Sequence, residues 1–284
     1  MRFIIDNYTT ASSSQALYFA EHLNEMEEHE VRMLKQGQES IFDAFDRFKP
    51  DFYITSTGLL SKDAVVYISQ SKNIKLIIST NDANNSDVVE IESALLDSKI
   101  NCPFFISNLR DEKKPMTKKT KVIRFMECVD LNFDADVGVD YSIDKLVMVG
   151  SNTDSVRNYN GTFHVASHNQ DMAKVVDVCL PINLMVSIIS KYKEVIFQEI
   201  GDYLPQLFFH SIASGIPTYY DLEDKERSDI VDTMCDKVFG VGNKLNYTSS
   251  DKITDFDSLK ELVLEKHTST RRVKSLLSQL PTKK

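Results

Sequence analysis

A glycine-serine turn near the middle of the chain is the first segment whose residues could do chemistry. Gly150 and Ser151 follow an apolar run, and Arg157 lies a short distance further on. Glycine lets a ligand approach the backbone closely, and successive backbone N–H groups in such a turn bind anions. An arginine guanidinium pairs with phosphate through two parallel hydrogen bonds. The segment therefore indicates a diphosphate site, and an ordinary turn between a strand and a helix is the alternative.

A second informative segment runs from Gly201 to Pro217. Pro205 opens an apolar stretch that predicts a helix, and the turn Gly215-Ile216-Pro217 ends it. The positive N-terminal end of such a helix suits a phosphate or a developing anion. Asp202 and His210 supply a carboxylate and an imidazole to this segment, so both are candidates for contacts with a ligand.

Asp82 is the main candidate for a catalytic base. It follows the apolar run Ile74–Ile78, a predicted strand, so it lies at a carboxyl end, where open α/β sheets bind their ligands. A carboxylate about 2.6–3.2 Å from a hydroxyl can take its proton. A helix cap is the alternative explanation, because residues 84–87 are also capping types. Glu127 is the second carboxylate candidate.

Two further polar clusters do not predict a metal site. His164 and His168 lie close in sequence but lack a nearby pair of carboxylates. Asp134 and Asp136 form an Asp-x-Asp pair, a pattern that can hold a metal against a diphosphate. That pair lies within the acidic, weakly structured stretch Asn132–Tyr141, which we interpret as a linker.

The sequence predicts alternating strands and helices, and these elements must position the candidate residues. Near-continuous apolar strands between helices predict parallel sheets that are covered on both faces. The predicted strands are Phe3–Asp6, His29–Leu34, Asp51–Thr55, Ile74–Ile78, Phe104–Ile106, Lys145–Val149, Val195–Phe197, Thr218–Tyr220 and Lys237–Gly240. The predicted helices run from the caps Ser12–Ser14 through Leu23, and over Ile41–Phe48, Ala64–Ile68, Val88–Leu96, Pro205–Ser214, Ser258–Leu264 and Thr268–Leu280.

The repetition of this pattern predicts two domains. We expect one Rossmann-like domain over residues 1–135 and a second over 136–284, with the last helix free to pack back on the first domain. Two such domains would face each other across a cleft. Ligands of open α/β sheets bind beyond the carboxyl ends of the strands, so that cleft is the expected active site.

The composition is that of an ordinary globular protein. Of the 284 residues, 42% are hydrophobic and 26% are charged, and the net charge is −9. Nucleic-acid-binding proteins usually show a basic surplus, so this charge argues against a DNA substrate. One basic stretch is an exception and could either contact phosphates or form a solvated loop. It consists of Lys113, Lys114, Lys118, Lys119, Lys121 and Arg124.

The cysteines and the apolar runs indicate a cytoplasmic protein without a membrane partner. The chain has 4 cysteines and no Cys-x-x-Cys pair, which favours free thiols in a reducing compartment. No apolar run approaches the roughly 18 residues of a membrane span. The start of the chain is a predicted strand rather than a signal peptide. The cysteines are Cys102, Cys128, Cys179 and Cys235.

The segment from Gly201 to Pro217 resembles the donor-site helix of GT-B glycosyltransferases. That family has an acidic residue, a proline, a second acidic residue and a turn of the form Ala-x-Gly-x-Pro. Asp202, Pro205 and the turn Ala213–Pro217 match it, whereas His210 stands where the family has its ribose-binding glutamate. The resemblance implies an α/β GT-B fold whose C-terminal domain binds a nucleotide sugar and whose N-terminal domain faces the acceptor.

A closer resemblance is to the DNA β-glucosyltransferases of T-even bacteriophages. These enzymes move glucose from UDP-glucose to 5-hydroxymethylcytosine in phage DNA. The similar segments follow one another in the same order along most of the chain. They are Ser13–Tyr18, Ser79–Asp82, Val122–Glu127, Gly150–Arg157 and Leu180–Ser187. The resemblance implies inverting transfer from a UDP-sugar to hydroxymethylated cytosine, in the cytoplasm of an infected host, with double-stranded DNA bound through the stretch Lys113–Arg124.

The resemblance also implies roles for single residues around the donor. Ser151 and Arg157 would hold the diphosphate beside Gly150, and Leu180 belongs to the stretch whose backbone reads uracil. Asp202 would contact the sugar and His210 the ribose, and Gln15 opens the first helix where the family has glutamate. Thr153 stands where the family's phosphate loop has its first arginine.

The acceptor side of the resemblance gives Asp82 as the general base, with Glu127 as the next carboxylate. We expect no tightly bound cofactor, because the donor is a substrate. Whether a Mg²⁺ ion assists the diphosphate stays open. Three alternatives also stay open. They are a catalytically silent GT-B binding domain, a transferase that acts on protein, lipid or polysaccharide, and an enzyme that adds a second sugar to a glucosylated base.

Overall fold

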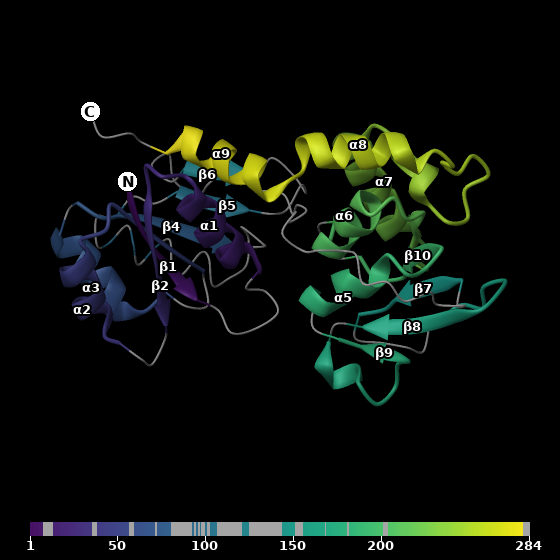
Figure 1. Ribbon diagram of the computed structural model, residues 1–284, viewed down its shortest axis with the longest axis horizontal. Coiled ribbons are helices and arrows are strands. Elements are labelled where there is room, and N and C mark those ends of the chain that lie inside the picture. The colour runs from purple at the N-terminus through teal and green to yellow at the C-terminus, as the bar shows by residue number, and fades with distance from the viewer. Residues whose placement is uncertain are drawn as a thin grey trace. The chain divides into compact units, whose positions relative to one another are not determined.

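The chain forms two compact units (Figure 1). Unit 1 comprises Met1–Met126 together with Arg272–Lys284, and unit 2 comprises Glu127–Arg271. The computed structural model describes residues 1–7, 14–35, 39–56, 60–71, 73–80, 103–106, 121–124, 144–150, 156–167, 169–180, 182–200 and 204–280, with the single positions 93, 95, 97 and 100.

Unit 1 is built on a parallel sheet with the strand order β2-β1-β3-β4-β5-β6. Its first strand pairs with the second on one side and with the third on the other, so the strand order reverses beside β1. The strands are β1 (Arg2–Asn7), β2 (Glu30–Lys35), β3 (Phe52–Ser56), β4 (Lys75–Thr80), β5 (Pro103–Ile106) and β6 (Lys121–Arg124). The helices include α1 (Ser14–Glu25), α2 (Ile41–Phe48) and α3 (Lys62–Ser71).

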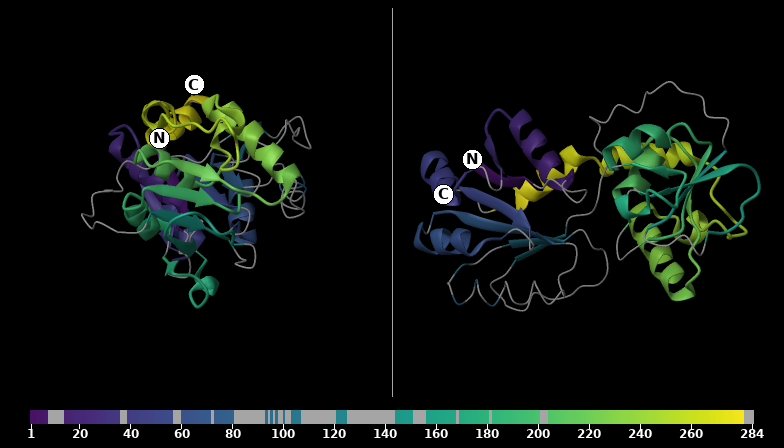
Figure 2. Two further views of the ribbon diagram at one scale, coloured as in Figure 1. Left: turned by 90° about the vertical axis from the view of Figure 1, so that its right-hand side faces the viewer. Right: turned by 90° about the horizontal axis from the view of Figure 1, so that it is seen from below.

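Alternation along the strands gives the sheet of unit 1 two apolar faces. Phe3 and Ile5 pack on one face with α1, and Ile4 packs on the other with α2 and α3. Successive strand residues point to opposite faces, and here both are apolar. Helix α9 (Ser269–Gln279) lies beside α1 and contributes Val273 and Leu276 to their shared core (Figure 2).

Unit 2 repeats the design with the strand order β11-β10-β7-β8-β9, again with parallel pairs throughout. Its first strand, β7, lies in the middle, and the order reverses between β7 and β10. The strands are β7 (Lys145–Met148), β8 (Phe163–Ser167), β9 (Val178–Cys179), β10 (Glu194–Phe197) and β11 (Thr218–Tyr220). The helices are α5 (Ile182–Ile189), α6 (Gln206–Ala213), α7 (Lys225–Phe239) and α8 (Phe256–Lys266), with short 3₁₀ turns at Gln170–Met172 and Gly242–Leu245.

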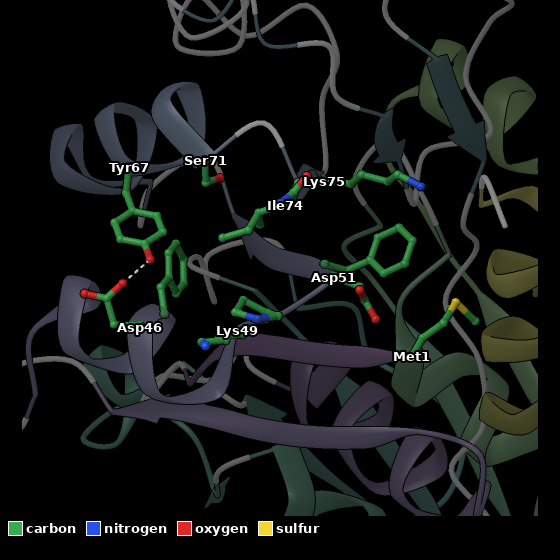
Figure 3. Close-up of a pocket in the computed structure, with 12 residues that line it drawn as sticks. Met1, Asp46, Lys49, Asp51, Tyr67, Ser71, Ile74 and Lys75 are labelled. Atoms are coloured by element: carbon green, nitrogen blue, oxygen red, sulfur yellow. Dashed lines mark hydrogen bonds between the residues drawn. The ribbon is translucent and has the colours of Figure 1, made fainter. Parts of the chain in front are cut away.

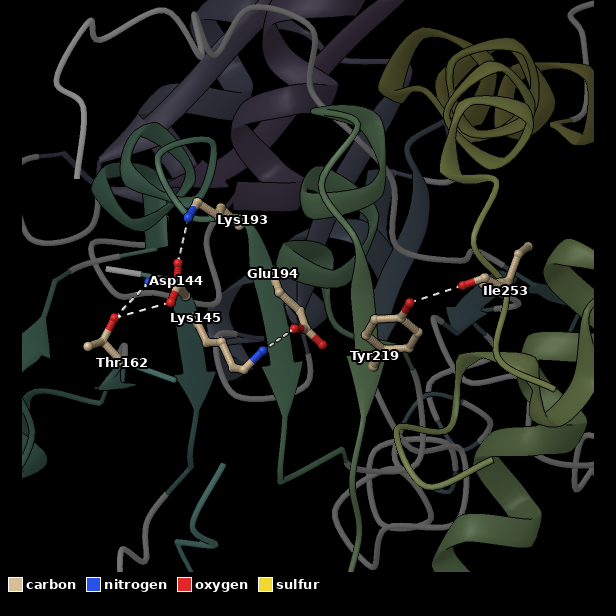
Figure 4. A network of polar contacts seen from close by, with 7 residues as sticks. All are labelled: Asp144, Lys145, Thr162, Lys193, Glu194, Tyr219 and Ile253. Atoms are coloured by element: carbon tan, nitrogen blue, oxygen red, sulfur yellow. Dashed lines mark hydrogen bonds and ion pairs between the residues drawn. The ribbon is translucent and has the colours of Figure 1, made fainter. Parts of the chain in front are cut away.

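A polar network ties the amino ends of the central strands of unit 2 (Figure 4). Lys145 and Glu194 lie opposite each other in the pairing of β7 with β10, and their side chains form an ion pair. Lys193 donates to Asp144, whose backbone N–H is bonded to the hydroxyl of Thr162 at 3.2 Å. These contacts fix the register at the edge opposite to the carboxyl ends.

Most predicted strands and helices are confirmed, but the predicted strand Lys237–Gly240 is wrong. Residues 237–239 are the last turn of α7, and Gly240 ends that helix with a φ of 71°. The side chain of Asp224 caps its start by accepting from the N–H of Glu226. The short apolar pair Val238-Phe239 resembles a strand in isolation, yet its burial belongs to one helix face that begins seven residues earlier with Val231 and includes Met234 and Cys235.

We predict that Leu276→Ala lowers the free energy of unfolding of unit 1 by about 2–5 kcal/mol, the usual cost of truncating a buried leucine. Leu276 is 1% exposed and belongs to the core that α9 shares with β1 and β3. Denaturant unfolding measures the loss, and Lys274→Ala on the exposed side of α9 is the control. Equal unfolding curves for the two variants would contradict the packing of α9.

Candidate functional site

The reversal of strand order in unit 2 defines its candidate site. Ligands of open α/β sheets bind at the carboxyl ends of the strands, in the crevice where the order reverses. In unit 2 this point lies between β7 and β10. Gly150 follows β7, and Gln198 and Glu199 follow β10. These residues therefore line the position at which a ligand of this sheet is expected.

Gly150 lies directly against the carboxylate of Glu199. A Cβ atom on Gly150 would lie 1.9 Å from Oε2 of Glu199 and 2.6 Å from its Oε1, so a larger residue there would require this end of a flexible side chain to shift. The carbonyl oxygen of Gly150 accepts a hydrogen bond from Ser167 Oγ at 3.0 Å, which holds the turn. The group that lies against Gly150 is thus a side chain of the protein, and the approach of a ligand to this backbone stays a prediction.

Arg157 belongs to a partly buried polar network across the same edge. Its guanidinium forms an ion pair with Asp221, which follows β11 and is 3% exposed. Tyr159 donates to the other oxygen of Asp221 at 2.8 Å, and Gln198 donates to the hydroxyl of Tyr159 at 2.7 Å. The network joins the segment after β7 to the ends of β10 and β11.

The electrostatics of this network keep Tyr159 neutral and leave part of Arg157 accessible. Burial, followed by the hydrogen bond to Asp221, raises the pKa of Tyr159 far above its usual range. The side chain of Arg157 is 35% exposed, although one of its nitrogens is engaged. A guanidinium has five N–H donors, so the remaining ones can bind an anion at this edge.

His210 lies in the core of unit 2. It is 4% exposed within α6, whose residues Gln206–Ile212 are all buried. Its Nε2 lies 3.2 Å from Nε2 of Gln206. Burial lowers the pKa of His210 to about 4, so the imidazole is neutral at physiological pH. The ribose contact of His210 stays a prediction, and it concerns a neutral, buried ring beside Gln206.

Leu180 follows the edge strand β9, two residues before α5 begins. Its backbone N–H donates to the carbonyl oxygen of Ser167 at 3.3 Å, and its side chain is half-buried. Ser167 also holds Gly150, so the two predicted donor-site residues share one neighbour. The predicted recognition of uracil by the backbone of the stretch that contains Leu180 stays a prediction.

Several predicted site residues lie outside the described residues. These are Asp82, Glu127, Ser151 and Asp202. Gln15 lies in α1, but its side chain is not among those described. Of the basic stretch, residues 121–124 form β6, and their side chains are likewise outside the description. The linker stretch 132–141 is also outside it.

A buried carboxyl group lies beside β1, where the strand order of unit 1 reverses. The sequence analysis identified this residue, Asp6, only as the end of a predicted strand. Asp6 ends the apolar part of β1 and is 2% exposed. Its Oδ2 accepts hydrogen bonds from Tyr53 and Thr55 of β3, while its Oδ1 has no partner within the described part of the chain. Burial raises the pKa of Asp6, against the two hydrogen bonds that lower it. The pair β1–β3 thus carries an acid at its carboxyl end.

A pocket of about 710 Å³ lies at the other edge of the sheet in unit 1 (Figure 3). Asp51 precedes β3 and Lys75 begins β4, so the pocket lies at the amino ends of these strands. Tyr67 donates to Asp46 at one side of it. Parallel α/β sheets bind ligands at the carboxyl ends, so this pocket is not the candidate active site.

The described residues contain no group of three His, Cys, Asp or Glu side chains that could hold a metal ion. His164 is instead bonded through Nδ1 to the hydroxyl of Tyr192 at 2.9 Å. Cys179 and Cys235 carry free thiols. In the described part of the chain, no helix has the length and apolar character required to cross a membrane.

No protein-family model matches the chain, and no curated protein matches it in sequence. Solved structures are similar over nearly the whole length. The glycosyltransferase SsfS6 of Streptomyces sp. SF2575 is 12% identical, with 98% of this chain and 100% of that chain covered and a TM-score of 0.50. Sucrose-phosphate synthase of Thermosynechococcus elongatus is 9% identical, with 97% and 94% covered and a TM-score of 0.54.

A third similar structure is Staphylococcus aureus MnaA in complex with UDP. It is 8% identical, with 98% of this chain and 95% of that chain covered and a TM-score of 0.51. At such low identity the likeness defines the fold alone. The chain has an α/β fold with two parallel Rossmann-like sheets, and this fold is GT-B-like, as the sequence predicted.

We predict that His210 makes unit 2 less stable in acid. Its folded pKa of about 4 lies below the ordinary 6.5, so the folded state resists protonation. The contribution of the neutral His210 to the free energy of unfolding is therefore fully present above pH 6.5. It declines as the pH falls toward 4. Denaturant unfolding at several pH values should show wild type losing about 2–3 kcal/mol relative to His210→Gln over this range. Parallel pH profiles for the two proteins would contradict a buried neutral His210.

Proposed function

We propose that this chain transfers a sugar from a UDP-sugar to a hydroxyl acceptor. The observation that carries the proposal is the pair of parallel Rossmann-like sheets in a GT-B-like fold, with a glycine turn and an accessible arginine at the reversal point of unit 2. Nucleotide-sugar transfer needs a site for the diphosphate and a base for the acceptor, and the two units supply candidates for each.

The donor diphosphate is proposed to bind at the carboxyl edge of unit 2. Gly150 and Ser151 would offer backbone N–H groups, and the free donors of Arg157 would pair with the phosphates. As the bond to the anomeric carbon breaks, negative charge grows on the leaving diphosphate. A fixed guanidinium at that position stabilises the transition state more than the ground state. Asp202 is proposed to contact the sugar.

The acceptor hydroxyl is proposed to be activated by Asp82. Strand β4 ends at Thr80, so Asp82 follows its carboxyl end. In an inverting transfer the carboxylate takes the hydroxyl proton as the oxygen attacks the anomeric carbon from the face opposite to the diphosphate. Glu127 is the alternative base. The proposal requires no tightly bound cofactor and leaves a Mg²⁺ ion on the diphosphate to be tested.

Hydroxymethylated cytosine in phage DNA is the acceptor that the ordered sequence resemblance favours, either directly or through a glucose already on the base. The basic stretch Lys113–Arg124 supports DNA, whereas the net charge of −9 favours a protein, lipid or polysaccharide acceptor. The departures at Gln15, Thr153 and His210 favour a silent binding domain.

One experiment separates these readings. The protein is incubated with UDP-sugars, with and without Mg²⁺, and with DNA containing cytosine, hydroxymethylcytosine or glucosylated hydroxymethylcytosine. Mass spectrometry of the nucleosides then reports the product. A hexose added to a modified cytosine supports the DNA acceptor. UDP release without a DNA product favours another acceptor, and UDP binding without turnover favours the silent domain.

Arg157→Ala is expected to weaken UDP binding by about 1.5–3 kcal/mol, the range for hydrogen bonds to charged groups. The same change leaves the buried Asp221 without its ion-pair partner, so a loss of stability of about 1–3 kcal/mol should accompany it. Calorimetry and denaturant unfolding separate the two effects. Arg157→Lys is the matched control, because it keeps the charge but loses the planar fork. Unchanged UDP affinity in the alanine variant would remove Arg157 from the donor site.

Asp82→Ala is expected to reduce the transfer rate by about 10²–10⁴-fold while UDP affinity stays near wild type, because a general base acts on the acceptor and not on the nucleotide. The rate is measured with the acceptor that gives product, and the affinity by calorimetry. Glu127→Ala serves as the comparison. If Asp82→Ala keeps its rate and Glu127→Ala loses it, Glu127 is the base.

A further inference from the structure

We propose that the outward face of α9 binds the phosphate backbone of a nucleic-acid duplex. Helix α9 is drawn in yellow in Figure 1, and its outward face consists of Arg271, Lys274, Ser275 and Ser278, which are all exposed. The inference goes beyond the proposed function, because a duplex can bind to this face whether or not it accepts a sugar.

The end of the chain is basic, in contrast to the chain as a whole. Residues 266–284 contain six basic and no acidic side chains, whereas the net charge of the chain is −9. A basic segment of this kind in an acidic chain indicates an anionic partner. The basic residues are Lys266, Arg271, Arg272, Lys274, Lys283 and Lys284, of which the last two lie outside the described residues.

The packing of α9 determines which of its side chains point outward. Val273 and Leu276 are buried in the core that α9 shares with β1 and β3. The exposed positions 271, 274, 275 and 278 follow one another at spacings of three, one and three residues, so they form one stripe on the opposite side of the helix. The core of unit 1 therefore holds two cations and two hydroxyl groups on a single outward face.

The two cations of this face do not stabilise α9 itself. Arg271 lies in the first turn, where the positive end of the helix dipole disfavours a cation, and that turn has no acidic residue. Arg271 and Lys274 are three residues apart, a spacing at which like charges repel. Neither guanidinium nor ammonium group forms an ion pair within the part of the chain that the structure describes. An anionic partner would relieve this repulsion.

The side chains of the face favour a phosphate backbone over other anionic partners. Arginine, lysine and serine are side chains that contact DNA phosphates. The stripe from Arg271 to Ser278 is roughly 10 Å long, a length over which duplex DNA presents about six phosphates. None of the four side chains is apolar, whereas a membrane-surface helix and the centre of a protein interface both require apolar side chains.

The test is the binding of a fluorescently labelled DNA duplex of about 30 base pairs, measured by anisotropy without a sugar donor. The double variant Arg271→Gln/Lys274→Gln should bind about tenfold more weakly than wild type at about 50 mM salt. The slope of log affinity against log salt should fall by about 2, roughly one for each lost phosphate contact. Two unrelated sequences should show the same loss, because backbone contacts carry no sequence information.

Lys225→Gln/Lys237→Gln is the matched control, because it removes the same charge from exposed positions of α7. It should keep the wild-type affinity and slope, and denaturant unfolding checks that each variant is folded. Equal losses in the two double variants, or no binding of the duplex by wild type, would overturn the inference.

Vesicles that contain phosphatidylserine separate the duplex from a membrane surface. If wild type binds these vesicles and not the duplex, and the Arg271→Gln/Lys274→Gln variant loses that binding, the inference is overturned in favour of an anionic membrane. Sugar transfer and UDP binding are measured separately, so each of these failures leaves the proposed function standing.

Discussion

The parallel direction of the strands in each sheet is the constraint on which the candidate sites of this protein depend. All carboxyl ends of a parallel sheet lie at one edge, and where the order of strands reverses, the segments that leave two neighbouring strands diverge and open a crevice. In unit 2 the reversal between β7 and β10 brings Gly150 and Glu199 into contact, although they lie far apart in the sequence. The ion pair of the partly exposed Arg157 with the buried Asp221 then ties a third strand end to this edge. Because Arg157 is paired with Asp221, an anion that binds at this edge as proposed would meet a guanidinium that is already oriented.

Unit 1 has the same kind of reversal, but different side chains lie beside it. Beside β1, the group at the carboxyl end is Asp6, a buried acid that accepts from Tyr53 and Thr55 and whose pKa is raised by burial. The described side chains at the reversal of unit 2 include the exposed carboxylate of Glu199 and the partly exposed guanidinium of Arg157. In the proposed function, the partly exposed guanidinium of unit 2 suits a nucleotide donor, and the candidate base Asp82 belongs to unit 1.

The sequence predicted the fold well wherever a local pattern determines the element. The apolar run before Pro50 predicted α2 with its observed ends, Ile41 and Phe48, and the strand Val195–Phe197 differs from β10 by one residue. Helix α7 was missed because its mean composition is polar and its buried residues recur at helical spacing only over fifteen residues. Of the candidate site, Gly150 and Arg157 came from a local turn motif. Glu199, Asp221 and Tyr159 did not, since pairing across three strand ends is a property of the sheet and leaves no local signal.

The central claim is that the carboxyl edge of unit 2 binds a nucleoside diphosphate at the reversal between β7 and β10. A crystal structure of the protein with UDP tests it most directly. The account predicts that the diphosphate lies beside the turn at Gly150 and within hydrogen-bond distance of Arg157, with the ribose toward the end of β10. A structure in which UDP contacts only residues of unit 1, or binds the pocket at the amino ends of β3 and β4, would contradict it.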